Sequence, residues 1–227
     1  MKQRIFTGIF LALEAVLYYL ILTAGGKVLV ASCFLSILLC ACFALVNWGD
    51  KCIIAGLACT VMADLFLVVW QPQQQLWGMV WFLCAQSLYA VKLQRMKHSK
   101  ALGIVRIALT GIGALVTVVV LQEKTDALAV ISVCYYANLI MNIVQSMANF
   151  RKVPLLAIGF VLFLLCDTVI GLQVAAGGYL PISEGSLLYR IIFMDFFLSW
   201  FFYLPSQVLI ALSSLQNEQI RPKGVSS

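Results

Sequence analysis

Charged residues are scarce in this chain of 227 residues. Asp, Glu, Lys and Arg together make up only 11% of it, whereas 63% of the residues are hydrophobic. A soluble domain carries about a quarter charged residues, so no stretch here is polar enough to form a separate soluble domain. The composition predicts an all-α, polytopic integral membrane protein.

Metal-ligand motifs are also lacking. The chain has one histidine, His98, and its eight cysteines form no CxxC pair. Nearly all of these cysteines lie in apolar runs, where a free Cys packs between helices as a small apolar residue. We therefore expect neither a metal site nor a disulfide framework, and no cofactor is indicated.

Eight apolar runs are each long enough to cross a bilayer, which takes about 20 helical residues. We interpret the chain as a single integral membrane domain, 1–227, with eight transmembrane helices. The predicted spans are 5–24, 28–46, 52–70, 76–93, 102–121, 127–147, 154–175 and 187–213.

Positive charge is concentrated on one side of this topology. An even number of spans places both termini on the same side, and most Lys and Arg residues fall there, while only Lys27, Lys124 and Arg190 fall on the other. The positive-inside rule therefore predicts cytoplasmic N and C termini, in a multi-pass protein of the bacterial inner (plasma) membrane. Topology and anionic lipids account for the net charge of +6, so no nucleic-acid partner is expected; the oligomeric state is left open.

Aspartates inside the predicted spans stand out, because ionisable residues in hydrocarbon are functional by default. Asp64 lies 12 residues after Cys52, and Asp167 lies 13 residues after Pro154. At about 1.5 Å per residue both fall roughly 18–20 Å from the cytoplasmic end of their helices. Asp195, near the start of the last span, falls at the same depth, so we predict that the three share one level of the bilayer.

Polar residues recur at helical spacing in two spans. In the span 127–147 and just beyond it, the polar residues are Tyr135, Asn138, Asn142, Gln145 and Asn149. In the last span they are Asp195, Ser199, Tyr203 and Gln207. Such faces avoid lipid and predict a polar, hydrated cavity bounded by the third, fourth, sixth, seventh and eighth helices. For the sixth helix, interhelical hydrogen bonding is an equal alternative. Glu14 is expected to have a structural partner, and Arg106 is expected to snorkel to the bilayer surface.

Three segments resemble the signatures of the YhhN-type membrane proteins, which include the lysoplasmalogenases. They are GLACTVMADLFLVV with GMVWFLCAQSLYAV, then GFVLFLLCDTVIG, and finally YLPSQVLIALS. The polar positions that match the family pattern are Asp64, Tyr89, Asp167, Tyr203 and Gln207. Gln86 stands where the family usually has His, and Asp195 has no clear counterpart.

The resemblance implies hydrolysis of the vinyl ether bond of a lysoplasmalogen, a lysophospholipid substrate, to an aldehyde and a glycerophospho-alcohol. In this hypothesis Asp64 and Asp167 are the catalytic pair: one protonates carbon, and the other stabilises the cation and orients water. The expected supporting residues, which orient water and the glycerol hydroxyl, are Gln86, Tyr89, Asp195, Tyr203 and Gln207. The expected substrate-binding residues are Asn138, Asn142 and Arg190.

Two other functions remain open. A transporter or lipid scramblase also needs intramembrane carboxylates, but the halves 1–113 and 114–227 show no internal repeat, and Pro205 is the only proline well inside a span. A non-catalytic lipid-binding protein would keep the fold without the chemistry. Gln86 favours this second reading, because an amide cannot exchange a proton at neutral pH.

Overall fold

The computed structural model describes residues 2–70, 72–96, 100–176, 183, 185–194 and 198–219. Within these ranges the chain is helical and contains no strand, which confirms the predicted all-α class. Eight of the helices are long and apolar enough to cross a membrane, as predicted. The helices are α1 Lys2–Thr23, α2 Gly26–Val46, α3 Lys51–Asp64, α4 Gln75–Met96, α5 Lys100–Leu121, α6 Ala127–Ala148, α7 Pro154–Ala176, α8 Leu187–Ile192 and α9 Leu198–Ser213.

The long last helix predicted over 187–213 is wrong. α8 ends at Ile192, Phe193 and Met194 are not helical, and α9 begins at Leu198. The candidate span is consequently the shorter segment Leu198–Gln216. The segment 187–213 contains only two charged residues, Arg190 and Asp195, and a mostly apolar run does not by itself distinguish one long helix from two helices with a connection.

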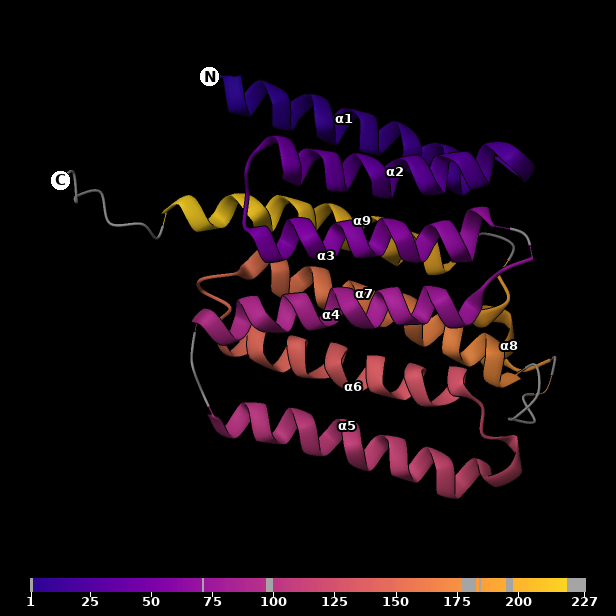
Figure 1. Cartoon of the computed structure of the whole chain (residues 1–227). Helices are drawn as coiled ribbons and strands as arrows, with labels where there is room; N and C mark the ends of the chain where they lie inside the picture. The colour runs from indigo at the N-terminus through magenta and orange to yellow at the C-terminus, as the bar shows by residue number, and fades with distance from the viewer. Residues whose placement is uncertain are drawn as a thin grey trace.

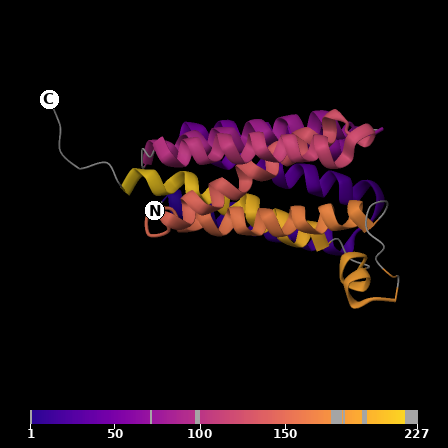
Figure 2. The ribbon, with the colours of Figure 1, turned by 90° about the horizontal axis from the view of Figure 1, so that it is seen from below.

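The long helices run side by side in a bundle (Figure 1), and α1 begins at the same end at which α9 finishes. We call this the basic end, because the helix termini gathered there carry Arg4, Lys51, Arg95, Arg151 and Lys152. Seen from below, α7 and α9 (orange and yellow) lie on one side and α4 and α5 (magenta) on the other (Figure 2). α6 joins the two sides by packing against α4, α5 and α7.

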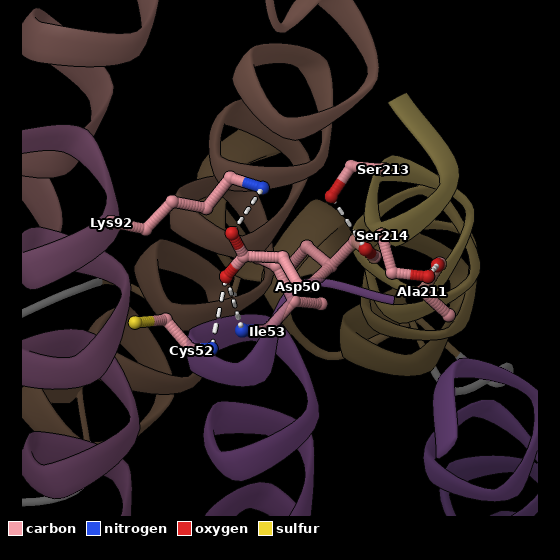
Figure 3. A network of polar contacts seen from close by, with 8 residues as sticks. Asp50, Cys52, Ile53, Lys92, Ala211, Ser213 and Ser214 are labelled. Carbon is pink, nitrogen blue, oxygen red and sulfur yellow. Dashed lines mark hydrogen bonds and ion pairs between the residues drawn. The ribbon is translucent and has the colours of Figure 1, made fainter. Parts of the chain in front are cut away.

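The α2–α3 connection is fixed to two other helices at the basic end (Figure 3). Asp50 caps α3 by accepting hydrogen bonds from the backbone N–H groups of Cys52 (2.9 Å) and Ile53 (3.3 Å). Its other carboxylate oxygen lies 3.7 Å from the Lys92 ammonium of α4, whose side chain is only 2% exposed. Gly49 packs so closely on Ser214, just beyond α9, that a Cβ would come within 2.5 Å of it.

The first helix is attached to the bundle by two polar contacts. Glu14 accepts hydrogen bonds from Ser36 (2.7 Å) and Cys40 (3.3 Å) of α2, which gives this buried carboxyl group the structural partners that the sequence predicted. Farther along α1, the Tyr18 hydroxyl donates to the Phe201 carbonyl of α9 at 3.2 Å. In a regular helix the N–H of residue 205 would donate to that carbonyl, but residue 205 is proline and has no N–H. The Phe201 carbonyl can therefore accept from Tyr18 of α1.

Candidate functional site

Asp64 is the last α-helical residue of α3. The chain continues as a π-helical segment, η1 Leu65–Val69, in which the Trp70 N–H reaches back five residues to the Leu65 carbonyl at 2.9 Å. Such irregular turns are frequent at functional sites. The Asp64 side chain is 3% exposed, and its Oδ2 accepts a hydrogen bond of 2.7 Å from the Tyr203 hydroxyl of α9.

Asp167 has the same kind of partner on a different pair of helices. It lies on α7, is partly buried, and accepts a hydrogen bond at Oδ2 from the Tyr135 hydroxyl of α6. Each of the two aspartates is therefore held by a tyrosine from a neighbouring helix. We call Asp64, Tyr203, Asp167 and Tyr135 the aspartate–tyrosine site.

Two phenylalanines connect the halves of this site. Phe82 of α4 packs on both tyrosines, with ring centroids 5.9 Å from Tyr135 and 6.3 Å from Tyr203. Phe163 of α7 does the same, at 6.4 Å and 5.4 Å. Each aspartate is therefore attached, through its tyrosine, to the same cluster of four aromatic rings. Residues 103 positions apart in the sequence thus meet at one apolar-walled centre, to which five helices contribute.

A buried guanidinium lies beside this centre, and here the sequence prediction was wrong. Arg106 of α5 does not snorkel to the bilayer surface: it is 7% exposed and faces the polar stripe of α6. Its Nη1 donates to Asn138 Oδ1 at 2.9 Å, and its Nη2 donates to Asn142 Oδ1 (2.8 Å) and Gln145 Oε1 (3.2 Å). The neutral amides thus accept from both terminal nitrogens of the buried cation, whereas its Nε has no hydrogen-bond partner among the described residues.

The same α6 stripe reaches α4 through Asn142. The Asn142 Nδ2 donates to the side-chain Oε1 of Gln86 at 2.8 Å and to the Gln86 carbonyl at 2.9 Å. Gln86 is completely buried, and among the described residues its Nε2 has no hydrogen-bond partner. Gln86 lies one helical turn from Phe82, on the same face of α4, so it adjoins the aspartate–tyrosine site from the side of the basic end.

The other predicted site residues are placed differently. Gln207, one turn beyond Tyr203 on α9, is buried and donates from Nε2 to Ser206 Oγ at 3.4 Å. Tyr89 packs against Phe160 and the backbone of α3 rather than on an aspartate. Arg190 is exposed on the short helix α8. Asp195, the third predicted aspartate, lies outside the described residues.

Tyr135 is the site residue that sequence reasoning passed over. It begins the polar stripe on α6, but its contact with Asp167 could not be read from the sequence because the spacing indicates a face and not the neighbour of that face. Among the residues that the structure describes, no group of three His, Cys, Asp or Glu side chains could hold a metal ion.

Comparison with known protein families matches residues 27–214 to the YhhN family. The chain belongs to the YhhN family. The matched range contains α2 to α9, so all four residues of the aspartate–tyrosine site lie inside it, whereas α1 with Glu14 and Tyr18 lies before it. No curated protein and no solved structure matches the chain.

Proposed function

We propose that this YhhN-family membrane protein is a lysoplasmalogenase-like hydrolase that cleaves the vinyl ether bond of a lysoplasmalogen at the aspartate–tyrosine site. The observation that carries the proposal is that Asp64 and Asp167 are each held by a tyrosine hydroxyl, and that these two tyrosines pack on the same two phenylalanines. Membership of a family that includes lysoplasmalogenases supports it.

A vinyl ether is hydrolysed through protonation of the alkene carbon farther from the ether oxygen. The proton comes from a carboxylic acid, and the electrons of the double bond form the new C–H bond, which leaves an oxocarbenium ion. Water attacks the cationic carbon to give a hemiacetal, which collapses to an aldehyde and the glycerophospho-alcohol. The reaction needs one protonated carboxyl group and one anionic group, and general acid–base help of this kind is worth about 10²–10⁴ in rate.

The aspartate–tyrosine site supplies both groups. Burial and a second carboxyl group nearby favour a carboxyl pair that shares one proton. The protonated member delivers the proton to carbon, while the ionised member stabilises the oxocarbenium ion and orients the attacking water. The phenylalanine and tyrosine rings between the aspartates provide apolar walls for the alkenyl chain. Asp64 and Asp167 each have a tyrosine hydroxyl as hydrogen-bond partner, so either can take either role.

The test is hydrolysis of lysoplasmenylethanolamine by the purified full-length protein in lipid nanodiscs, with the aldehyde trapped by borohydride and measured by mass spectrometry. In D₂O, protonation at carbon places a single deuterium on the carbon next to the former carbonyl. A product that carries no deuterium there would rule out the proposed protonation step.

Substitution of either aspartate tests the assignment of residues. Asp64→Asn and Asp167→Asn are each expected to lower kcat by at least about 10²-fold, the smaller value for loss of acid–base help. Asp126→Asn is the matched control: Asp126 caps α6 by accepting from the Ala129 N–H at 2.7 Å, and Asn caps a helix equally well. Full activity in either site variant would remove that aspartate from the mechanism, and lysolipid binding without turnover in the wild type would favour a non-catalytic family member.

A further inference from the structure

Arg106, Asn142 and Gln86 form a chain of hydrogen bonds in which each side-chain amide could be oriented in two ways. The nitrogen and oxygen of a side-chain amide have nearly the same shape, so the neighbours decide which atom points where. A guanidinium has only N–H donors. The atom of Asn142 that lies 2.8 Å from Arg106 Nη2 must consequently be the oxygen.

That choice propagates to the next helix. With its oxygen turned to Arg106, Asn142 presents its NH₂ group to α4, and an NH₂ group can only donate. The Gln86 atom at 2.8 Å must then be its oxygen, Oε1, which leaves Nε2 on the far side. Asn142 also donates to the Gln86 backbone carbonyl, a fixed acceptor that reinforces the same orientation. The guanidinium of α5 thus determines the polarity of an amide two helices away.

The Gln86 Nε2 is the open end of this chain. Gln86 is fully buried, and its Nε2 has no hydrogen-bond partner among the described residues. A buried donor without a partner has lost its hydrogen bonds to water without replacement, so a ligand atom that accepts from it would be bound favourably. Phe82, four residues earlier on the same face of α4, packs on both tyrosines of the aspartate–tyrosine site, so the backbone of Gln86 lies only about 6 Å farther along the helix axis than that of Phe82.

We propose that Gln86 donates a hydrogen bond from Nε2 to an oxygen atom of the lysolipid's glycerophosphate portion, and that Arg106 is a positioning residue that fixes this donor through Asn142. The lipid's identity rests on the proposed function. A vinyl ether bound at the aspartates has its glycerol and phosphate oxygens next to it in the molecule, and Gln86 lies on the side of the site toward the basic end. The lipid therefore binds with its head group toward the basic end of the bundle.

Asn142→Asp reverses the polarity of the chain. One carboxylate oxygen accepts from Arg106, the other can only accept from α4, and Gln86 has to turn its Nε2 toward Asp and its Oε1 toward the ligand. Gln145→Glu is the matched control, because Gln145 accepts from the same Nη2 atom at 3.2 Å without contacting Gln86 in the structure. Both variants place one new carboxylate beside the same guanidinium.

Binding is measured with the saturated ether lysolipid 1-O-hexadecyl-glycero-3-phosphoethanolamine, which has no vinyl ether to cleave, and with purified protein in nanodiscs. Asn142→Asp is expected to weaken binding at least about tenfold, the effect of an unmatched buried hydrogen-bond partner, while Gln145→Glu binds as the wild type does. Gln86→Glu replaces the donor by an oxygen directly, and a loss of the same size is expected. If Asn142→Asp fails to fold, the binding affinity of Gln86→Glu alone tests whether Nε2 donates to the lipid.

Two further probes identify the oxygen that accepts. If it is the glycerol hydroxyl, the effect of Gln86→Glu disappears with the 2-deoxy lysolipid; if it is a phosphate oxygen, the effect disappears with 1-O-hexadecylglycerol. Arg106→Lys keeps a group with donors only and is expected to retain binding that Arg106→Met loses.

The inference is overturned if Gln86→Glu binds the probe as tightly as the wild type, if Gln145→Glu loses as much as Asn142→Asp, or if the wild type does not bind. It survives a failure of the hydrolase proposal, because a wild type that binds with the expected pattern without cleaving lysoplasmenyl lipid refutes only the chemistry.

Discussion

Gly56 is the position at which the packing of the site's supporting helices can be tested most sharply. It is buried on α3, two turns before Asp64, and faces the fully buried ring of Tyr89 on α4. A Cβ at residue 56 would lie 2.2 Å from Tyr89 Cε1 and 2.6 Å from Cζ. Ordinary contact begins at 3.4 Å, so the ring or the helix has to move by about 1 Å, and cores resist such shifts.

The ring has little room to retreat. On the other side of Tyr89 lies Phe160 of α7, with ring centroids 5.4 Å apart. Gly56→Ala is therefore expected to lower the free energy of unfolding by about 1–3 kcal/mol, the usual cost of overpacking. SDS titration of the purified protein in mixed micelles measures this quantity.

Two comparisons make the result decisive. Gly111→Ala on α5, where nothing lies within 4 Å of the new Cβ, is expected to leave stability unchanged or raised by up to about 1 kcal/mol, because Ala is the better helix former. In the double variant Gly56→Ala with Tyr89→Leu, removal of the ring should recover at least about 1 kcal/mol as a coupling energy. Equal stability of the Gly56→Ala and Gly111→Ala proteins would refute the close approach of α3 and α4.

Three other variants test polar contacts by the same stability measurement. Tyr203→Phe deprives the buried Asp64 carboxyl of its donor and should cost about 1–3 kcal/mol, and an unchanged value would mean that the bond is not formed. Asp50→Ala removes the α3 cap and leaves the Lys92 ammonium buried without this partner, so it should lower the free energy of unfolding by about 3–5 kcal/mol. Lys92→Met leaves Asp50, which is 21% exposed, and should cost less than about 1 kcal/mol. A larger loss for Lys92→Met than for Asp50→Ala would contradict the network of Figure 3. Tyr18→Phe removes the hydroxyl that donates to the Phe201 carbonyl and should lower the free energy of unfolding by about 1 kcal/mol. No loss would show that this hydrogen bond does not help to hold α1 on the bundle.

The architecture was largely accessible from the sequence. Eight apolar runs predict eight spans because a helix must satisfy its backbone internally in lipid, and the part of the chain that the structure describes contains eight such helices. Asp64 and Asp167 were singled out for the same reason, since carboxyl groups in hydrocarbon are costly. Their common depth in the bilayer, expected from the rise per residue, stays a prediction; the structure shows that their tyrosine partners pack on the same two phenylalanines.

The partners of these groups were decided by the tertiary structure. Helical spacing indicated a polar face on α6 but not that Tyr135 would meet Asp167 or that Arg106 would turn inward to Asn142. In a membrane bundle nearly every helix face is apolar, so hydrophobicity does not specify which helix packs against which. A guanidinium turns inward rather than to the bilayer surface only when an amide of another helix is within hydrogen-bond distance, and the sequence does not show that distance. The break between α8 and α9 was hidden for a related reason: residues 187–213 are mostly apolar, with Arg190 and Asp195 as their only charged residues, and hydrophobicity alone does not determine where such a segment stops being a helix.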